Sequence, residues 1–223
     1  MLRQVFAAAL ASLALLSFPS FAIQPAVPLS VASPFRFTID PVLRTDFNAL
    51  NGAELSVDFA QRLGAGFEWG ASLHGGAASR RLFVANEQTI GVLGLDVMGR
   101  YFGEITPVFH VGIELDLGYT QNLSSPSSGG SALARLSLPF VMRFEKSVAM
   151  FIAPGIQSEG SLLGNSRMAA STFGQAFGAN LAVGLLFYTE GPGVFVAARP
   201  GWQDVRYPGD VSADFTVGLV IDL

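Results

Sequence analysis

Apolar residues recur at every second position over most of this chain, in segments that Gly, Pro, Asn or Ser residues interrupt. Successive side chains of a β-strand point to opposite faces, so a period of two predicts strands with one apolar and one polar face. The ten predicted strands cover residues 35–45, 53–63, 65–76, 89–102, 109–120, 131–145, 148–157, 172–188, 193–203 and 211–223.

The charged residues of these segments all fall on the polar faces. In residues 109–120, for example, Ile113 and Leu115 alternate with Glu114 and Asp116. An ionised group facing lipid at mid-bilayer costs on the order of 2–4 kcal/mol, so a face without charge is suited to lipid. The side chains that we expect to line an enclosed interior are Arg36, Asp40, Arg44, Glu54, Asp58, Arg62, Glu68, Asp96, Arg100, His110, Glu114, Asp116, Arg135, Arg143, Arg199 and Asp214.

The composition favours a membrane as the place where the apolar face is covered. Half of the 223 residues are apolar and 13% are charged, whereas soluble domains contain roughly 25% charged residues. Beyond the N-terminal region, no apolar run approaches the roughly 20 residues of a spanning helix, and the other structure that can cross a bilayer is a closed barrel. We therefore predict an all-β fold, a transmembrane antiparallel up-and-down β-barrel of ten strands, or of eight if the weak first or seventh strand does not form.

Other fold and partner classes fit the composition less well. A soluble β-sandwich would also alternate, but its charged face would meet water and be rich in lysine, and Lys146 is the only lysine. The net charge of −4 argues against a nucleic-acid partner. The absence of cysteine excludes disulfides and thiolate metal sites.

The N-terminal region has the pattern of an export signal. Arg3 precedes an apolar run, Val5 to Phe18, that is too short to span a bilayer, and the small-x-small site Ser20-Phe21-Ala22 follows. We predict a signal peptide over residues 1–22 and cleavage after Ala22. The mature protein is then expected in the bacterial outer membrane.

Prolines dominate the residues that follow. Pro25, Pro28 and Pro34 predict an extended periplasmic lead-in over residues 23–34. The outer-membrane β-barrel domain is predicted over residues 35–223.

Short and long connections alternate, as they do in barrels with short periplasmic turns and longer outer loops. Tight turns are predicted around Gly64, Gly103-Glu104, Lys146-Ser147 and Glu190-Gly191-Pro192. The longer loops are predicted over residues 46–52, 77–88, 121–130, 158–171 and 204–210. A closed barrel has no edge strand to accommodate proline, so we expect β-bulges at Pro41, Pro139, Pro154 and Pro200.

The last strand carries the most specific pattern. Residues 216–223, TVGLVIDL, resemble the terminal signal that barrel-assembly machinery reads in small outer-membrane β-barrel proteins of Gram-negative bacteria, although Leu223 stands where Phe or Trp is usual. The resemblance covers the whole mature chain as a pattern and implies contact with outer-membrane lipid and lipopolysaccharide. It also implies an encounter with the assembly machinery during biogenesis. Because the chain stops at its last strand, we expect no peptidoglycan-binding domain.

The predicted lumen is narrow and charged. Ten strands enclose little more space than the eight-stranded barrels that side chains just fill. Charges of both signs in such a space predict an internal salt-bridge network, and hence a non-enzymatic barrel with a structural or surface-interaction role through its loops. A narrow passive solute channel is the alternative. We find no phosphate loop, zinc spacing or calcium loop and expect no cofactor or metal.

One constellation suggests an enzyme. If Leu63-Gly64-Ala65 is a three-residue hairpin loop, Glu54 lies opposite His74 and Ser56 opposite Ser72. Ser72, His74 and Glu54 would then be weak candidates for a nucleophile, a base and an orienting acid. Some outer-membrane lipid-A-modifying hydrolases use these residue types. The alternative is a His–Glu pair within the lumen network.

Overall fold

A computed structural model gives the fold of the chain. It describes residues 25–29, 33–45, 50–81, 87–123, 129–144, 147–163, 175–188, 192–204 and 210–223. The predicted signal peptide, the loop residues 124–128 and the central parts of the other long loops lie outside these ranges. No helix in the described part is long and apolar enough to cross a membrane.

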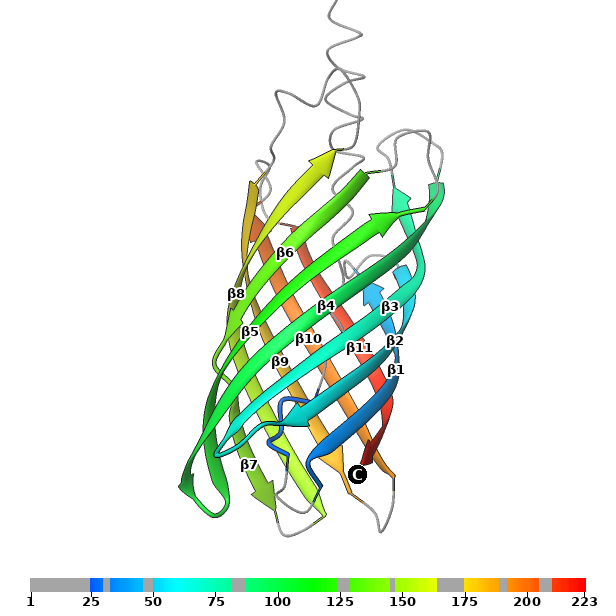
Figure 1. The fold of residues 1–223 in the computed structure, drawn as a ribbon. Helices are drawn as coiled ribbons and strands as arrows, with labels where there is room; N and C mark the ends of the chain where they lie inside the picture. The colour runs from blue at the N-terminus through cyan, green and yellow to red at the C-terminus, as the bar shows by residue number, and fades with distance from the viewer. Residues whose placement is uncertain are drawn as a thin grey trace, which may run out of the picture.

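The described part is a single antiparallel sheet that closes into a barrel (Figure 1). Its strands are β1 (Phe35–Thr45), β2 (Leu50–Arg62), β3 (Phe67–Arg81), β4 (Glu87–Thr106), β5 (Phe109–Asn122), β6 (Gly129–Ser137), β7 (Phe140–Phe144), β8 (Val148–Leu163), β9 (Gln175–Phe187), β10 (Gly193–Asp204) and β11 (Asp210–Asp222). Apart from β6 and β7, consecutive strands pair with each other, and β1 pairs with β11 to close the ring.

Two of these elements share one position in the wall. β6 and β7 both pair with β5 on one side and β8 on the other. The wall therefore has ten positions, which confirms the predicted ten-stranded up-and-down barrel and excludes eight.

The prediction of bulges at the prolines is wrong. The break between β6 and β7 falls at Pro139, but Ser137 pairs with Gly155 and Phe140 with Ile152, so the register continues unchanged. Backbone groups stay bonded across the break, because the Gly112 N–H donates to the Pro139 carbonyl at 2.8 Å.

The other prolines leave the register unchanged as well. Pro154 pairs with Leu181 in the ladder to β9. At Pro41 and Pro200 the ladder to one neighbour has a gap and then resumes in the same register. The ladder thus omits a hydrogen bond at each proline, and no additional residue is inserted into the strand.

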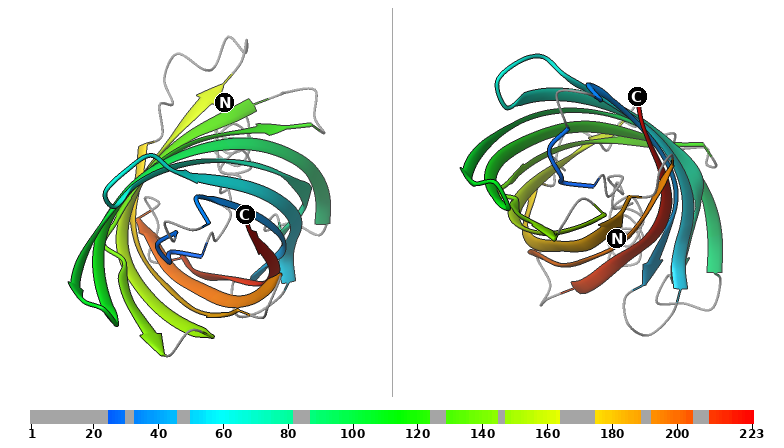
Figure 2. Two further views of the ribbon diagram at one scale, coloured as in Figure 1. Left: turned by 60° about the horizontal axis from the view of Figure 1, so that its bottom comes forward. Right: turned by 90° about the horizontal axis from the view of Figure 1, so that it is seen from below.

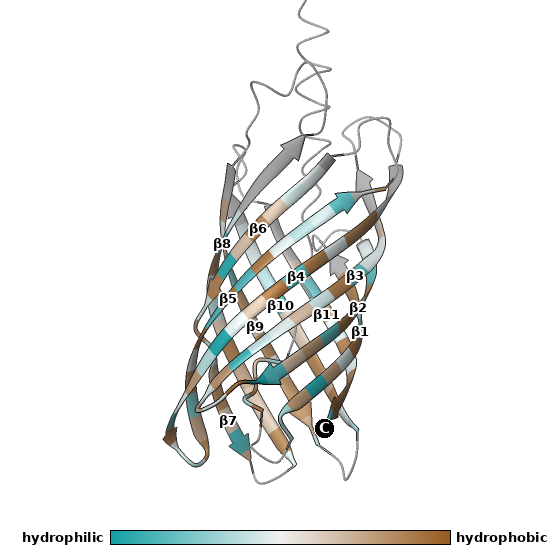
Figure 3. Ribbon diagram, in the orientation of Figure 1, coloured by the Kyte–Doolittle hydropathy of each residue, from teal (hydrophilic) through white to brown (hydrophobic). Residues whose placement is uncertain are grey.

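The two surfaces of the wall differ in polarity. Leu55, Val57 and Leu95 are about half exposed on the outside, at 53%, 46% and 55%, while the alternate positions are buried inside. Hydrophobic and hydrophilic residues accordingly alternate along the strands in Figure 3. The charged strand residue Glu104 is exposed, but it lies beside the turn that follows β4. The described mid-strand charges face the interior, which leaves an apolar exterior suited to lipid.

The start of the first strand and the end of the last strand lie at the same end of the barrel. Phe35 and Leu223 exchange backbone hydrogen bonds at 3.0 and 2.9 Å. The turns after β2 and β4 lie at the same end, which is the periplasmic end in outer-membrane barrels. We call it the periplasmic end. The tight turns predicted at Lys146-Ser147 and Glu190-Gly191-Pro192 fall largely outside the described residues.

Two of the predicted tight turns differ in detail. The turn after β2 spans Leu63–Gly66, one residue longer than predicted, because Gly66 adopts a φ of 81° that favours glycine. The turn predicted at Gly103-Glu104 is wrong: β4 continues to Thr106, and Pro107-Val108 make the turn. Proline fits the first central position of such a turn.

Candidate functional site

Most predicted lumen residues lie buried in the interior. Arg36, Asp40, Glu54, Asp58, Glu68, Asp96, Arg100, His110, Glu114, Asp116, Arg135, Arg199 and Asp214 are each less than a tenth exposed. Arg62 and Arg143 are half-buried at the periplasmic end. Arg44 belongs to β1, but its side chain is outside the described part. The interior is therefore the candidate site.

Residues 25–29 occupy the periplasmic end of the interior. In the views along the barrel, this segment lies inside the ring of strands (Figure 2). Ala26, Val27 and Leu29 are 4%, 0% and 1% exposed. The sequence predicts a periplasmic lead-in here, whereas the described part of the lead-in fills the barrel opening.

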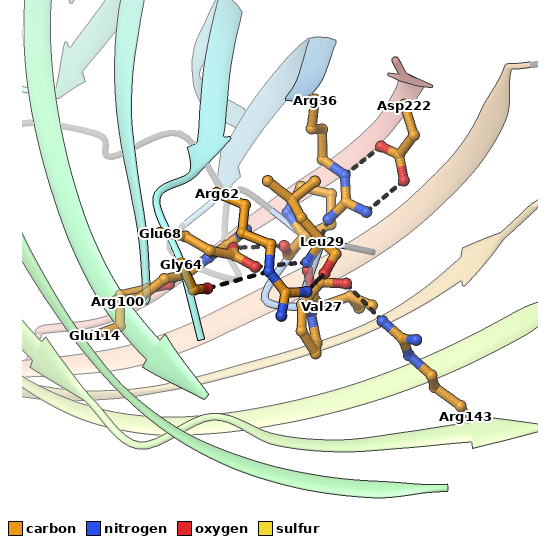
Figure 4. Close-up of polar contacts among 12 residues, drawn as sticks. Val27, Leu29, Arg36, Arg62, Gly64, Glu68, Arg100, Glu114, Arg143 and Asp222 are labelled. Atoms are coloured by element: carbon orange, nitrogen blue, oxygen red, sulfur yellow. Dashed lines mark hydrogen bonds and ion pairs between the residues drawn. The ribbon is translucent and has the colours of Figure 1, made fainter. Parts of the chain in front are cut away.

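Arginine side chains from the wall hold this segment by its backbone. Four guanidinium groups each donate to a different carbonyl oxygen of the segment (Figure 4). The bonds are Arg100 to Pro25 at 3.1 Å, Arg36 to Val27 at 2.8 Å, Arg143 to Pro28 at 2.6 Å and Arg62 to Leu29 at 2.7 Å. We call these four residues the arginine cradle.

Two carboxylates complete the cradle. Glu68 accepts from the Leu29 N–H through one oxygen and from Arg100 Nε through the other, both at 2.6 Å. Asp222 accepts two bonds from Arg36, at 2.6 and 2.7 Å. Charge-assisted and bidentate bonds of this kind fix orientation as well as distance. The carboxylates therefore aim two of the four guanidinium groups.

Apolar side chains of the barrel wall also pack against the segment. Ala26 and Val27 pack in one buried cluster with wall residues from β4, β7, β8, β9, β10 and β11. These wall residues, which we call the apolar collar, are Phe102, Val141, Ala149, Phe151, Leu186, Phe195, Ala197 and Val220. Leu29 packs separately against Ala60 and Met98. The periplasmic end of the lumen therefore bonds the backbone of the segment and packs against its apolar side chains.

The sequence analysis missed both the segment and the collar. A usable signal was present, because Phe102, Phe195 and Val220 share the alternation phase of the charged residues in their own strands. Several large apolar side chains facing the interior at one end of the barrel imply that something covers them, since exposed apolar surface in a water-filled lumen is unfavourable.

A chain of ion pairs runs along the inner wall over the adjacent strands β3, β4, β5 and β6. Arg100 reaches Glu68 at 2.6 Å and Glu114 at 3.7 Å, and Arg135 reaches Glu114 at 3.6 Å and Asp116 at 2.5 Å. A separate ion pair joins β10 to β11, where Arg199 lies 2.7 Å from Asp214. These contacts form the internal network that the mixed charges predict, and buried charges are retained where they are paired in this way.

The predicted register of the Ser–His–Glu constellation is wrong. Because the turn after β2 has four residues, His74 lies opposite Ser56 and Ser72 opposite Asp58. Glu54 Oε2 still lies 3.5 Å from His74 Nδ1, along the diagonal. Ser72 Oγ lies 3.0 Å from Ser56 Oγ, and the Ser56 hydroxyl donates to Asp58. The residues thus meet as a buried polar cluster, in which Ser72 is 2% exposed.

Within the described residues, no group of three or more His, Asp or Glu side chains is arranged to hold a metal ion.

No protein-family model and no curated protein sequence matches this chain. Several solved structures are similar in fold. A NanC porin aligns with a TM-score of 0.46 and 10% identity, over 84% of this chain and 100% of the porin chain. The translocator domain of the autotransporter NalP from Neisseria meningitidis aligns with a TM-score of 0.46 and 8% identity, over 99% of this chain and 96% of the domain.

The outer-membrane protease OmpT from Escherichia coli aligns with a TM-score of 0.46 and 9% identity, over 86% of this chain and 94% of OmpT. At such identities the likeness concerns the fold alone. A closed barrel with an apolar exterior and a polar interior is the architecture of integral outer-membrane proteins. The present protein is a barrel of this kind.

Proposed function

We propose that the protein is a closed, non-enzymatic barrel of the outer membrane, with a structural or surface-interaction role through its outer loops. The observation that carries this proposal is the filled periplasmic opening. Residues 25–29 lie within the ring of strands, bonded to the arginine cradle and packed against the apolar collar. An open channel needs a continuous water path, and residues 25–29 occupy the periplasmic end of that path.

The ion pairs above the segment support the same conclusion. Arg135 and Glu114 are 7% and 5% exposed, and each contacts charged partners from the neighbouring strands. In a wide solute channel these side chains would be hydrated. Their burial favours a packed interior over the alternative of a narrow passive channel.

The partners that we propose follow from the surfaces of the barrel. The apolar exterior suits lipid and the acyl chains of lipopolysaccharide. Residues 216–223 include the end of the closing strand β11, and we infer that barrel-assembly machinery reads them during biogenesis. The extracellular partner of the loops stays open.

Conductance in planar lipid bilayers tests the closed lumen. The mature protein should give no stable unitary steps after insertion, with insertion checked by its heat-dependent migration in detergent gels. Stable steps whose size changes in Arg135→Ala or Glu114→Ala would contradict a closed lumen and favour the channel. The matched control is Glu104→Ala, at an exposed carboxylate beside the turn after β4, which leaves both the arginine cradle and the interior ion pairs in place.

A further inference from the structure

The N-terminal segment contacts the barrel in the way a ligand does. Residues 25–29 belong to no strand. Their described hydrogen bonds to the wall come from side chains, namely the arginine cradle and Glu68. The remaining described bond is internal, from the Val27 N–H to the Pro25 carbonyl at 2.8 Å. Among the described residues, the contacts of the segment with the sheet are therefore side-chain hydrogen bonds and apolar packing, with no backbone pairing to a strand.

The cradle recognises main-chain atoms more than side chains. Four of the five bonds that the arginine cradle and Glu68 make to the segment end on carbonyl oxygens, which every residue type provides. Proline suits such a peptide, because it lacks an N–H that would need a partner in the buried opening and restricts the backbone; the Val27 N–H bond to the Pro25 carbonyl closes a three-residue turn. Pro25 and Pro28 both present their carbonyls to arginines.

The collar adds selectivity for small apolar side chains. Val27 is fully buried in it. Ala26 lines a small cavity together with Phe151, Ala153 and Ala182 and with the polar side chains of Glu114, Arg135, Ser137 and Asn180. A charged side chain at position 27 would be placed among Phe and Val residues without a water shell, which is strongly unfavourable. The site therefore fits a short, uncharged peptide that contains proline and a three-residue turn.

We propose that the periplasmic opening is a peptide-binding site whose tethered ligand is the segment 25–29. The arginine cradle binds the carbonyl oxygens of the peptide, and the apolar collar selects its side chains. The same site accepts free proline-containing peptides of this class from the periplasmic side when the tethered segment leaves. This inference goes beyond the proposed closed barrel, because it concerns what the opening binds and not whether the lumen conducts.

A cysteine trap tests the proposal in the full mature chain. The protein has no cysteine, so Ala153→Cys places a single thiol beside the position of Ala26. The probe is a synthetic peptide of residues 23–29 with Ala26→Cys, activated as its thionitrobenzoate disulfide. The protein thiolate attacks the peptide sulfur, thionitrobenzoate leaves, and a peptide–protein disulfide forms without any added oxidant. Mass spectrometry of the intact protein then measures the adduct.

The tethered segment competes with the probe. A short linker gives it an effective concentration on the order of millimolar, so the probe is used in the millimolar range. Because the trap is covalent, even a small fraction of exchanged sites accumulates as adduct. The expected result is a stoichiometric adduct with Ala153→Cys.

Two controls define the site. Ser131→Cys places a buried, lumen-facing thiol in the outer part of β6, far from the cradle, and should give no peptide adduct. A second peptide carrying Val27→Asp as well should react with Ala153→Cys at least about tenfold more slowly, since a carboxylate would enter the collar. Equal adduct at both protein positions, or with both peptides, would overturn the proposal.

The double variant Ala26→Cys/Ala153→Cys decides the meaning of a missing adduct. If its intrachain disulfide forms while the free peptide gives no adduct, the segment is a fixed part of the core and the peptide-site proposal fails. If neither disulfide forms, the segment does not sit where the proposal needs it, and the proposal fails again. Conductance steps from the mature wild-type protein would instead contradict the closed lumen, whatever the trap shows.

Discussion

Arg143 donates from Nη2 to the carbonyl oxygen of Pro28 at 2.6 Å, across 115 positions of sequence. Arg143 lies in β7, near the turn to β8, whereas Pro28 precedes the first strand. The bond joins the wall of the barrel, at its periplasmic opening, to the segment that lies inside. With the three other cradle bonds, it makes the N-terminal segment part of the interior of the barrel.

The buried ion pair between Glu68 and Arg100 should be important for stability. Both side chains are 1% exposed, and Glu68 also accepts from the Leu29 N–H. Glu68→Ala leaves Arg100 buried without its main carboxylate and should lower the free energy of unfolding by about 3–5 kcal/mol. Equilibrium unfolding in urea, followed by tryptophan fluorescence, measures this. Glu104→Ala, at an exposed carboxylate, should change stability by less than about 0.5 kcal/mol; equal losses in both variants would be inconsistent with the buried pair.

The turn after β2 offers a matched pair of glycines. Gly66 has a φ of 81°, and a Cβ there would meet the carbonyl of Phe102, whereas a Cβ on Gly64 would meet nothing within 4 Å. Gly66→Ala should therefore cost on the order of 1–3 kcal/mol, and Gly64→Ala should be close to neutral. The same urea unfolding measures both. If the two variants were equally stable, the positive φ at Gly66 would be in doubt.

The apolar exterior makes a prediction that depends on depth. Leu95 lies in the middle of β4 and is 55% exposed, while Ile105, 65% exposed, lies at its periplasmic end. Leu95→Arg should destabilise the protein in lipid vesicles by about 2–4 kcal/mol, and Ile105→Arg by about 0–1 kcal/mol. A smaller penalty at Leu95 than at Ile105 would mean that lipid does not cover this face as we describe.

The Ser–His–Glu cluster should not act as a hydrolase. Ser72 and His74 are each 2% exposed, and Ser72 faces Ser56 and Asp58 instead of a substrate cleft. Hydrolysis of p-nitrophenyl esters by the purified protein should be unchanged in Ser72→Ala and in His74→Ala. Loss of a measurable activity in both variants, with retention in Ser131→Ala, would restore the enzyme hypothesis.

The sequence was sufficient to predict the wall because lipid imposes a simple rule on it. Charges such as Asp96 and Glu114 must lie inside, and the alternation then determines the direction of every other side chain in the same strand. The interruption at Pro139 could not be predicted in detail. Whether proline causes a bulge or a gap depends on whether neighbouring groups, here the Gly112 N–H, can bond around it.

Two features of the structure could not be predicted from the alternation of apolar and polar residues. The register of β2 against β3 depends on one additional turn residue, because Gly66 can adopt a conformation that closes a four-residue loop. The placement of residues 25–29 depends on the reach of side chains from separate strands, such as Arg36 and Arg143. A five-residue segment has no periodicity from which such contacts could be inferred.

Amide hydrogen exchange at Leu29 tests the central claim most directly. Its N–H is buried and donates to Glu68 at 2.6 Å, so in the refolded mature protein it should exchange far more slowly than the same amide in an unstructured peptide, and faster than amides in the strands, such as that of Leu186, if the segment leaves the site without unfolding of the barrel. Nuclear magnetic resonance of the 15N-labelled protein in detergent micelles gives both rates. Exchange of the Leu29 amide at the rate of an unstructured peptide would contradict an opening filled by this segment.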